Sequence, residues 1–249
     1  RQEDPGFEMY VMLGAWIECQ GAWTPDVNHE AGDVENNTAE IATAVELANA
    51  YPETVKIIAV GNEAMVHWAT HYFVRPAVIL KWVKHLQGLK QSGGLPAHLW
   101  ITTSDNFASW GGGDASYHTK ELTALIEAVD FISLHTYPFH DTYYNPSFWV
   151  APDKEQKLSV VEKADAAMRR ARDYAVAQYE DTADYIESLG LRKPIHIGET
   201  GWASYASTSY GATGSQAADQ YNQKLFYQSM RVWTREAGRA CVELAARDA

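Results

Sequence analysis

The sequence predicts an α/β protein whose parallel strands alternate with helices and form one sheet covered by those helices. Short apolar runs rich in β-branched or aromatic residues alternate with longer segments at helical spacing. No hairpin signal separates the strands, and 46% hydrophobic residues in a chain of 249 supply a sizeable core. The pattern allows a barrel or a doubly wound sheet, and residues 1–249 are expected to form a single domain.

The expected elements follow that alternation in chain order. The apolar, strand-like runs cover residues 9–17, 55–61, 99–104, 131–136 and 194–199, with a weaker sixth at 239–244. The segments with helical spacing cover residues 38–50, 76–91, 119–128, 159–189 and 215–237. Thr38 is expected to begin the first helix as its cap. Each strand followed by a helix requires a crossover connection, which makes the strands parallel.

Composition excludes several functions. The 20 basic against 32 acidic residues give a net charge of −12, which repels nucleic acid and anionic lipid. No apolar stretch approaches the roughly 20 residues that a membrane-spanning helix needs, so no membrane insertion is expected. Residues 1–5 show no signal peptide, although a processed chain would have lost one.

Cofactor and metal motifs are weak in this sequence. Gly111–Gly113 lacks the later glycine and the lysine of a phosphate-binding loop, and with Trp110 it is expected to form a loop over a cleft or a surface turn. The nine histidines show no metal-ligand spacing, and Cys19 and Cys241 are expected to be reduced structural thiols. We therefore expect no metal and no organic cofactor.

Polar side chains of catalytic type follow the ends of four expected strands. The residues are Asn62 and Glu63, Asp105 and Asn106, His135 and Tyr137, and Glu199 followed by Trp202. In a parallel barrel, the carboxyl ends of the strands converge on one mouth, where active sites lie. Glu63 and Glu199 each close a mainly apolar strand, which holds a carboxylate more rigidly than a loop does.

Two strand-end carboxylates suit glycoside chemistry. Cleavage of a glycosidic bond needs a proton for the leaving oxygen and a negative charge near the oxocarbenium-like carbon, and a pair of Asp or Glu residues can supply both. Asn62 could bind the 2-hydroxyl of the sugar, and Tyr137 could hydrogen-bond the nucleophile. The alternative interpretation is that the glutamates form structural ion pairs.

Aromatic residues near the strand ends are candidate stacking surfaces for sugar rings. Phe139 and Trp202 are expected to contact substrate, whereas Trp82 and Trp233 lie in helical patterns and are expected to be buried. The other aromatic residues on or just after strand ends are Trp68, Trp110, Tyr137, Tyr143, Tyr144 and Trp149.

Three ordered motifs together resemble glycoside hydrolase family 17, the β-1,3-glucanases, and in particular bacterial laminarin-degrading members. They are the runs at residues 60–64 (Val-Gly-Asn-Glu-Ala), 135–139 (His-Thr-Tyr-Pro-Phe) and 198–202 (Gly-Glu-Thr-Gly-Trp). Residues 11–16, which end at Trp16, resemble the third strand of the family's barrel, and residues 104–106 resemble the end of its fifth strand.

The resemblance implies a (β/α)₈ barrel of the TIM type and a retaining double displacement, with Glu63 as acid/base and Glu199 as nucleophile. The substrate-binding residues implied or expected around them are Asn62, Asp105, Asn106, His135, Tyr137, Phe139, Trp202 and Trp16. In a retaining enzyme the two carboxyl groups lie about 5 to 5.5 Å apart.

The sequence departs from the family pattern at both ends. About six strand–helix units are counted, the motif order lacks the first two units of the barrel, and residues 240–249 lack the aromatic residues typical of the family's last strand. An incomplete barrel has unpaired edges, through which self-association is expected.

The expected function is that of an endo-β-1,3-glucan hydrolase of laminarinase type, with β-1,3-glucan as its partner. It is expected to be secreted or periplasmic, because polymeric glucan does not cross a membrane intact. One alternative is a β-1,3-glucan transglycosylase that uses the same residues, and another is a non-catalytic glucan-binding remnant of the fold.

Overall fold

The computed structural model of the protein describes residues 6, 8–141, 151–205 and 218–236. Five strands follow one another in one sheet in the order β1-β4-β5-β6-β7, and helices alternate with them along the chain. β1 pairs in parallel with β4, and β4 pairs in parallel with β5. The predicted parallel α/β fold is confirmed.

The observed elements agree with the expected ones to within a few residues at most ends. The strands of the sheet are β1 (Val11–Ala15), β4 (Val55–Asn62), β5 (Trp100–Asn106), β6 (Ile132–His135) and β7 (Ile195–Glu199). The α-helices are α1 (Val34–Ala50), α2 (Pro76–Ser92), α3 (Lys120–Ala128), α4 (Pro138–Asp141), α5 (Val160–Ser188) and α7 (Gln220–Glu236). The expected strand at 239–244 lies outside the described residues.

The chain groups into two compact units. Unit 1 comprises residues 1–133 and 184–194, and unit 2 comprises residues 134–183 and 195–249. The expectation of a single domain over residues 1–249 stays a prediction. The two units are described separately below.

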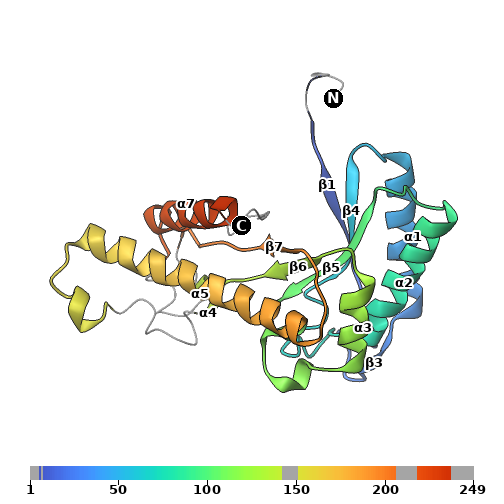
Figure 1. Ribbon diagram of the computed structural model, residues 1–249. Coiled ribbons are helices and arrows are strands. Elements are labelled where there is room, and N and C mark those ends of the chain that lie inside the picture. Colours follow the sequence, from blue (N-terminus) through green and yellow to red (C-terminus); the bar gives the residue numbers. More distant parts are fainter. Residues whose placement is uncertain (1–5, 7, 142–150, 206–217, 237–249) are drawn as a thin grey trace. The chain divides into compact units, whose positions relative to one another are not determined.

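The helices of unit 1 cover its parallel strands. α1 packs on β1 and β4, α2 packs on β4 and β5, and α3 packs against α2 (Figure 1). Ile58 and Val60 of β4 and Ile79, Val83 and Leu86 of α2 have no exposed surface, so they form the centre of this core. Trp82 is buried, as predicted from the helical pattern.

Helix α1 begins four residues earlier than predicted. Asp33, not Thr38, is the N-cap, because its carboxylate accepts a hydrogen bond from the Asn36 N–H at 2.8 Å. Thr38 lies one turn inside the helix, where its hydroxyl donates to the carbonyl of Val34. The prediction of the helix start was wrong because either side chain can cap a helix and only the chain path decides which one does.

A short antiparallel hairpin, β2 (Cys19–Gln20) and β3 (Asn28–Gly32), separates β1 from α1. The prediction that hairpins are absent was therefore wrong. Its seven-residue connection has no two-residue turn signal; instead Gly21 adopts a φ of +72°, and a Cβ there would lie 2.2 Å from the Asp26 carbonyl oxygen. Trp23 lies in this connection and is exposed.

The Trp110–Gly113 segment is a packed element of unit 1, which corrects the expected loop over the cleft. Ala108–Gly112 forms a π-helical turn, and Trp110 is fully buried with its indole N–H donating to the Ser133 carbonyl at 3.0 Å. Gly111 has a φ of +93°, and a Cβ at this position would lie 2.1 Å from the Tyr185 ring. Trp110 therefore offers no stacking surface.

Unit 2 has its own hydrophobic cluster. Phe139, Met168, Trp202, Phe226 and Met230 are buried together in it, and Trp233 is partly buried against it. The buried residues of helix α7 are Phe226, Met230 and Thr234, spaced by one helical turn, and the first two belong to this cluster.

Across the residues that the structure describes, no helix is both long enough and apolar enough to cross a membrane. Within the same residues, no group of three or more His, Cys, Asp or Glu side chains is placed to hold a metal ion. Cys19 is a buried free thiol, and burial raises its pKa. Cys241, Tyr143, Tyr144 and Trp149 lie outside the described residues.

Candidate active site

The predicted site residues divide between the two units. Unit 1 contains Trp16, Asn62, Glu63, Asp105 and Asn106, and unit 2 contains His135, Tyr137, Phe139, Glu199 and Trp202. The expected separation of the Glu63 and Glu199 carboxyl groups stays a prediction. Each group of residues is built locally by the ends of its own strands.

Glu63 follows β4 at a β-bulge. Ala59 lies opposite Thr102 of β5 and Asn62 lies opposite Ser104, so three steps along β4 match two along β5. Gly61 lies within the bulge and has a φ of +84°, and Glu63 has a φ of +46°. A glutamate in this left-handed region is uncommon, and such strained residues cluster at functional sites.

Asp105 is fully buried beside this bulge, which corrects its expected role as a substrate-binding side chain. One carboxylate oxygen accepts the Met65 N–H at 2.8 Å, and the other accepts the Asn106 N–H at 2.8 Å. Its carboxylate therefore contacts the backbone that carries Glu63. Asn106 is partly buried and accepts the Ala108 N–H at 3.0 Å, whereas Asn62 is exposed.

A group of aromatic rings, two of them exposed tryptophans, lies together in unit 1. Trp16 is 41% exposed and its ring centre lies 5.5 Å from that of Tyr72; Trp23 is 63% exposed and lies 5.2 Å from Tyr72. Trp23 also stacks on His71, whose carbonyl accepts the Trp23 N–H at 2.8 Å. We call Trp16, Trp23, His71 and Tyr72 the aromatic surface.

Within the aromatic surface, Tyr72 is affected by the charges of Glu63 and Asp105. Burial raises the pKa of Tyr72, and the negative charges of Glu63 and Asp105 raise it further. Sequence reasoning missed Tyr72 and Trp23, because neither follows a strand of the parallel sheet. The turn-forming residues Gly21 and Pro25 on either side of Trp23 were the available signal.

His67 and His71 both pack against aromatic rings of unit 1. His67 stacks on Tyr117 with ring centres 3.9 Å apart and lies 3.2 Å from the Arg75 guanidinium. Burial lowers the pKa of His67, and the charge of Arg75 lowers it further. Both effects favour a neutral imidazole that packs between rings.

Glu199 ends β7 in unit 2 and is held by two neighbours. Tyr137 donates its hydroxyl hydrogen to Glu199 Oε2 at 2.9 Å, and His135 Nδ1 lies 3.6 Å from the same oxygen. His135 is fully buried, and the Thr136 N–H donates to the Glu199 carbonyl at 3.0 Å. The hydrogen bond predicted between Tyr137 and this carboxylate is thus present.

Phe139 and Trp202 are buried, which differs from the expected contact with substrate. Each ring is 2% exposed, and they pack edge to face with centres 5.1 Å apart. Trp202 also contacts Phe226 of α7, and its carbonyl accepts a hydrogen bond from Gln223 at 3.1 Å. This burial indicates that both rings support the strand end that carries Glu199.

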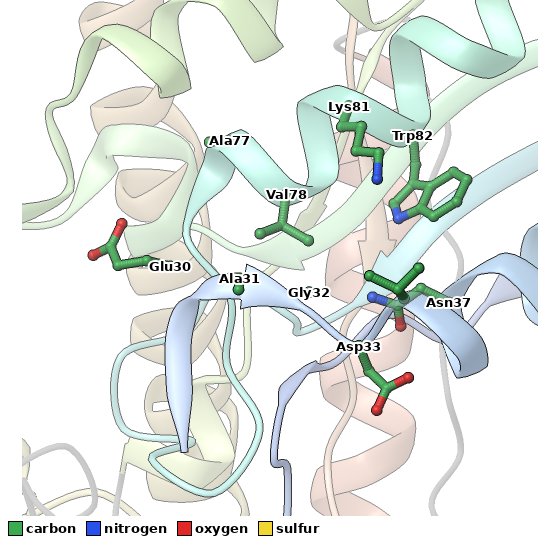
Figure 2. A pocket seen from close by; sticks show the side chains of 10 residues that line it. Glu30, Ala31, Gly32, Asp33, Asn37, Ala77, Val78, Lys81 and Trp82 are labelled. Carbon is green, nitrogen blue, oxygen red and sulfur yellow. The ribbon is translucent and has the colours of Figure 1, made fainter. Parts of the chain in front are cut away.

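A separate pocket of about 300 Å³ lies in unit 1 between β3 and the first turns of α1 and α2 (Figure 2). Lys81 and Trp82 line one wall, with the lysine Nζ 4.9 Å from the centre of the indole ring. Gly32 lines another wall, where a Cβ would lie 2.7 Å from Val78. No predicted site residue lines this pocket.

The parallel strands, the alternating helices and the glutamates at the strand ends follow the pattern of TIM-barrel glycosidases. No family model and no curated protein matches the sequence. Among solved structures, an endo-laminarinase from Formosa Hel1_33_131 is 59% identical, with a TM-score of 0.93, and the match covers 98% of this chain. The motifs that resemble glycoside hydrolase family 17 agree with this similarity to an endo-laminarinase.

This chain spans 62% of the length of that endo-laminarinase. Two structures of β-1,3-glucanosyltransferase from Rhizomucor miehei share the fold. An active-site mutant in complex with laminaritriose is 17% identical with a TM-score of 0.57, covering 86% of this chain and 62% of that one. The other, described as glycoside hydrolase family 17, is 15% identical with a TM-score of 0.53, covering 84% of this chain and 61% of that one.

Proposed function

We propose that the protein is a retaining endo-β-1,3-glucan hydrolase that acts on laminarin-type polysaccharide. The observation that carries the proposal is the 59% identity to an endo-laminarinase over 98% of this chain. The glutamates at the ends of β4 and β7 support it, because each is held by a rigid strand end. We also propose that the protein acts outside the cytoplasm, where its polymeric substrate is found.

In this mechanism Glu199 attacks the anomeric carbon while Glu63 protonates the departing glycosidic oxygen. The covalent glycosyl-enzyme is then hydrolysed by a water from which Glu63 removes a proton, so Glu63 regains its proton and Glu199 its charge. Tyr137 supports the nucleophile, because its hydroxyl fixes one Glu199 oxygen and leaves the other for attack.

The aromatic surface is proposed to bind glucosyl rings beside Glu63. Its two tryptophans are exposed, and stacking on a sugar uses the apolar face of the ring. Asn62, exposed next to Glu63, is proposed to bind a sugar hydroxyl. His135 is proposed to act near substrate through Glu199, since its own side chain is buried.

The test compares Glu63→Gln and Glu199→Gln on two substrates, laminarin and 2,4-dinitrophenyl β-laminaribioside. Glu63→Gln should lose activity on laminarin yet release dinitrophenol, because this leaving group needs no proton, and added azide should accelerate the release. Glu199→Gln should lose both activities. Glu53→Gln, an exposed glutamate at the opposite end of β4, is the matched control.

Product analysis completes the test. Release of reducing sugar with retained anomeric configuration supports hydrolysis by double displacement, whereas elongated oligosaccharides at low substrate concentration would indicate a transglycosylase. Binding of laminari-oligosaccharides by folded protein without any turnover would contradict an enzymatic function. Equal losses on both substrates in Glu63→Gln would contradict the acid/base assignment.

A further inference from the structure

The turn that carries Glu63 is held in an unfavourable backbone conformation. The bulge at Gly61 and the φ of +46° at Glu63 direct this glutamate out of the regular strand. A non-glycine residue is disfavoured in the left-handed region, because its Cβ crowds the following carbonyl oxygen, and it persists there only where its surroundings determine it. The surrounding hydrogen bonds must therefore supply the restraint.

Those hydrogen bonds come chiefly from the end of β5. The Glu63 N–H donates to the Ser104 carbonyl at 2.9 Å, and the Met65 N–H donates to Asp105 Oδ2 at 2.8 Å. The Val74 N–H donates to the Ala64 carbonyl at 2.7 Å from the other side. Each residue of the turn from 63 to 65 is thus hydrogen-bonded through its backbone. Among these three bonds, the one to Asp105 is the one made by a side chain.

Asp105 is fully buried, and both of its oxygens accept backbone N–H groups. Burial of a carboxylate is costly unless hydrogen bonds replace its water, and bonds to an ionised acceptor are stronger than neutral ones. A neutral asparagine keeps the size of the side chain but replaces one acceptor by an amide that donates. It can satisfy only one of the two N–H groups.

We propose that Asp105 is a positioning residue for Glu63: its buried carboxylate holds the backbone from Glu63 to Met65 so that the Glu63 carboxyl meets the leaving oxygen. This inference rests on the proposed acid/base role of Glu63. Asp105 acts on the proton-transfer step through the backbone, so its loss affects reactions that need the Glu63 proton. A displacement of about 1 Å at a catalytic group can cost up to about 10²-fold in rate.

The experiment measures Asp105→Asn, Glu63→Gln and the double variant on laminarin and on 2,4-dinitrophenyl β-laminaribioside. Asp105→Asn should lower kcat on laminarin by about 10- to 100-fold, with KM within about twofold of the wild type. Release of dinitrophenol in the pre-steady-state burst should change much less. In the Glu63→Gln background, Asp105→Asn should cause no further loss.

Asp130→Asn is the matched control. Asp130 also accepts a backbone N–H of the β5 region, from Ile101 at 2.7 Å, but it lies at the opposite end of the strand and pairs with Lys90. Asp130→Asn should lower stability and leave the ratio of the two activities unchanged. If Asp105→Asn does not fold, Asp105→Glu, which displaces the same acceptors by one methylene, should show the same substrate dependence.

Three results would overturn the proposal. They are an equal loss on both substrates in Asp105→Asn, a tenfold rise in KM with kcat unchanged, and a full additional loss when Asp105→Asn is combined with Glu63→Gln. A failure of the proposed function can be distinguished from a failure of this inference, because it is measured on the wild type and Glu63→Gln alone. In that case the wild type would show no turnover, or the activity of Glu63→Gln would not depend on the leaving group.

Discussion

Tyr137 donates a hydrogen bond to Glu199 Oε2 at 2.9 Å, and the two residues come from the ends of consecutive strands, β6 and β7. The same oxygen lies 3.6 Å from the buried His135 ring. One oxygen of the carboxylate is thus fixed by its neighbours within unit 2. Such fixed geometry is what an attacking carboxylate requires.

Replacing Tyr137 by phenylalanine should therefore slow the formation and breakdown of the glycosyl-enzyme. We expect kcat to fall by about tenfold on laminarin and on the dinitrophenyl glycoside alike, because the proposed nucleophile Glu199 would serve both substrates and a hydrogen bond to a charged group is worth about 1.5 to 3 kcal/mol. Steady-state kinetics on both substrates check this. A loss restricted to laminarin would instead connect Tyr137 with the leaving group.

The aromatic surface predicts an effect on substrate binding. Trp23→Ala should raise KM for laminarin by about tenfold, since stacking of an aromatic ring contributes on the order of 1 kcal/mol or more, and should change kcat less. Trp100→Ala is the control, because Trp100 is also exposed but begins β5 at the end remote from Glu63. Equal KM values for both variants would contradict a role of Trp23 in substrate binding.

Gly61 allows a test of the bulge that precedes Glu63. Its φ is +84°, and an added Cβ would lie 2.9 Å from the Ala64 Cβ, so Gly61→Ala should lower the free energy of unfolding by at least about 1 to 2 kcal/mol. Gly88→Ala is the matched control within α2, where an added Cβ meets no atom within 4 Å. It should stabilise the protein by about 0.5 to 1 kcal/mol.

Urea denaturation of both glycine variants gives these free energies. A Gly61→Ala variant as stable as the wild type would show that the backbone at the bulge is not constrained as described. The rate at which the protein releases reducing sugar from laminarin should fall in Gly61→Ala and should stay unchanged in Gly88→Ala.

Ionisation of Tyr174 is expected to lower the stability of unit 2 at alkaline pH. Burial raises its pKa to about 12, and the nearby negative charge of Asp141 adds to the shift. A raised pKa in the folded state means that the protonated phenol stabilises the fold below the unfolded pKa of about 10, and that this stability is lost as the pH rises through about 12. Tyr174→Phe should make the loss of stability over this pH range smaller.

The measurement is the urea midpoint of unfolding at several values between pH 8 and 12. Tyr205→Phe is the control, because Tyr205 is 75% exposed in the same unit. An unchanged pH dependence in Tyr174→Phe would separate Tyr174 from the alkaline unfolding. A smaller loss in both variants would assign the effect to tyrosine ionisation in general.

The prediction of the strands succeeded where the signal was local. The runs ending at Asn62 and Glu199 are apolar, β-branched and bounded by polar residues, so their positions could be read from neighbouring residues. The hairpin β2–β3 was missed because it lacks such a signal. Its pairing depends on a two-residue strand and on Gly21 in a positive-φ turn, which leave little periodic pattern.

The sequence by itself determined the parallel α/β class and the placement of Glu63 and Glu199 at strand ends, because hydrophobic periodicity acts over a few residues. Only the tertiary structure decided which side chains around the predicted site are buried. Asp105 binds backbone N–H groups and Phe139 and Trp202 lie in the core, whereas Trp23 is exposed. Burial depends on neighbours far apart in the chain, such as Met65 with Asp105, and no local pattern encodes those distances.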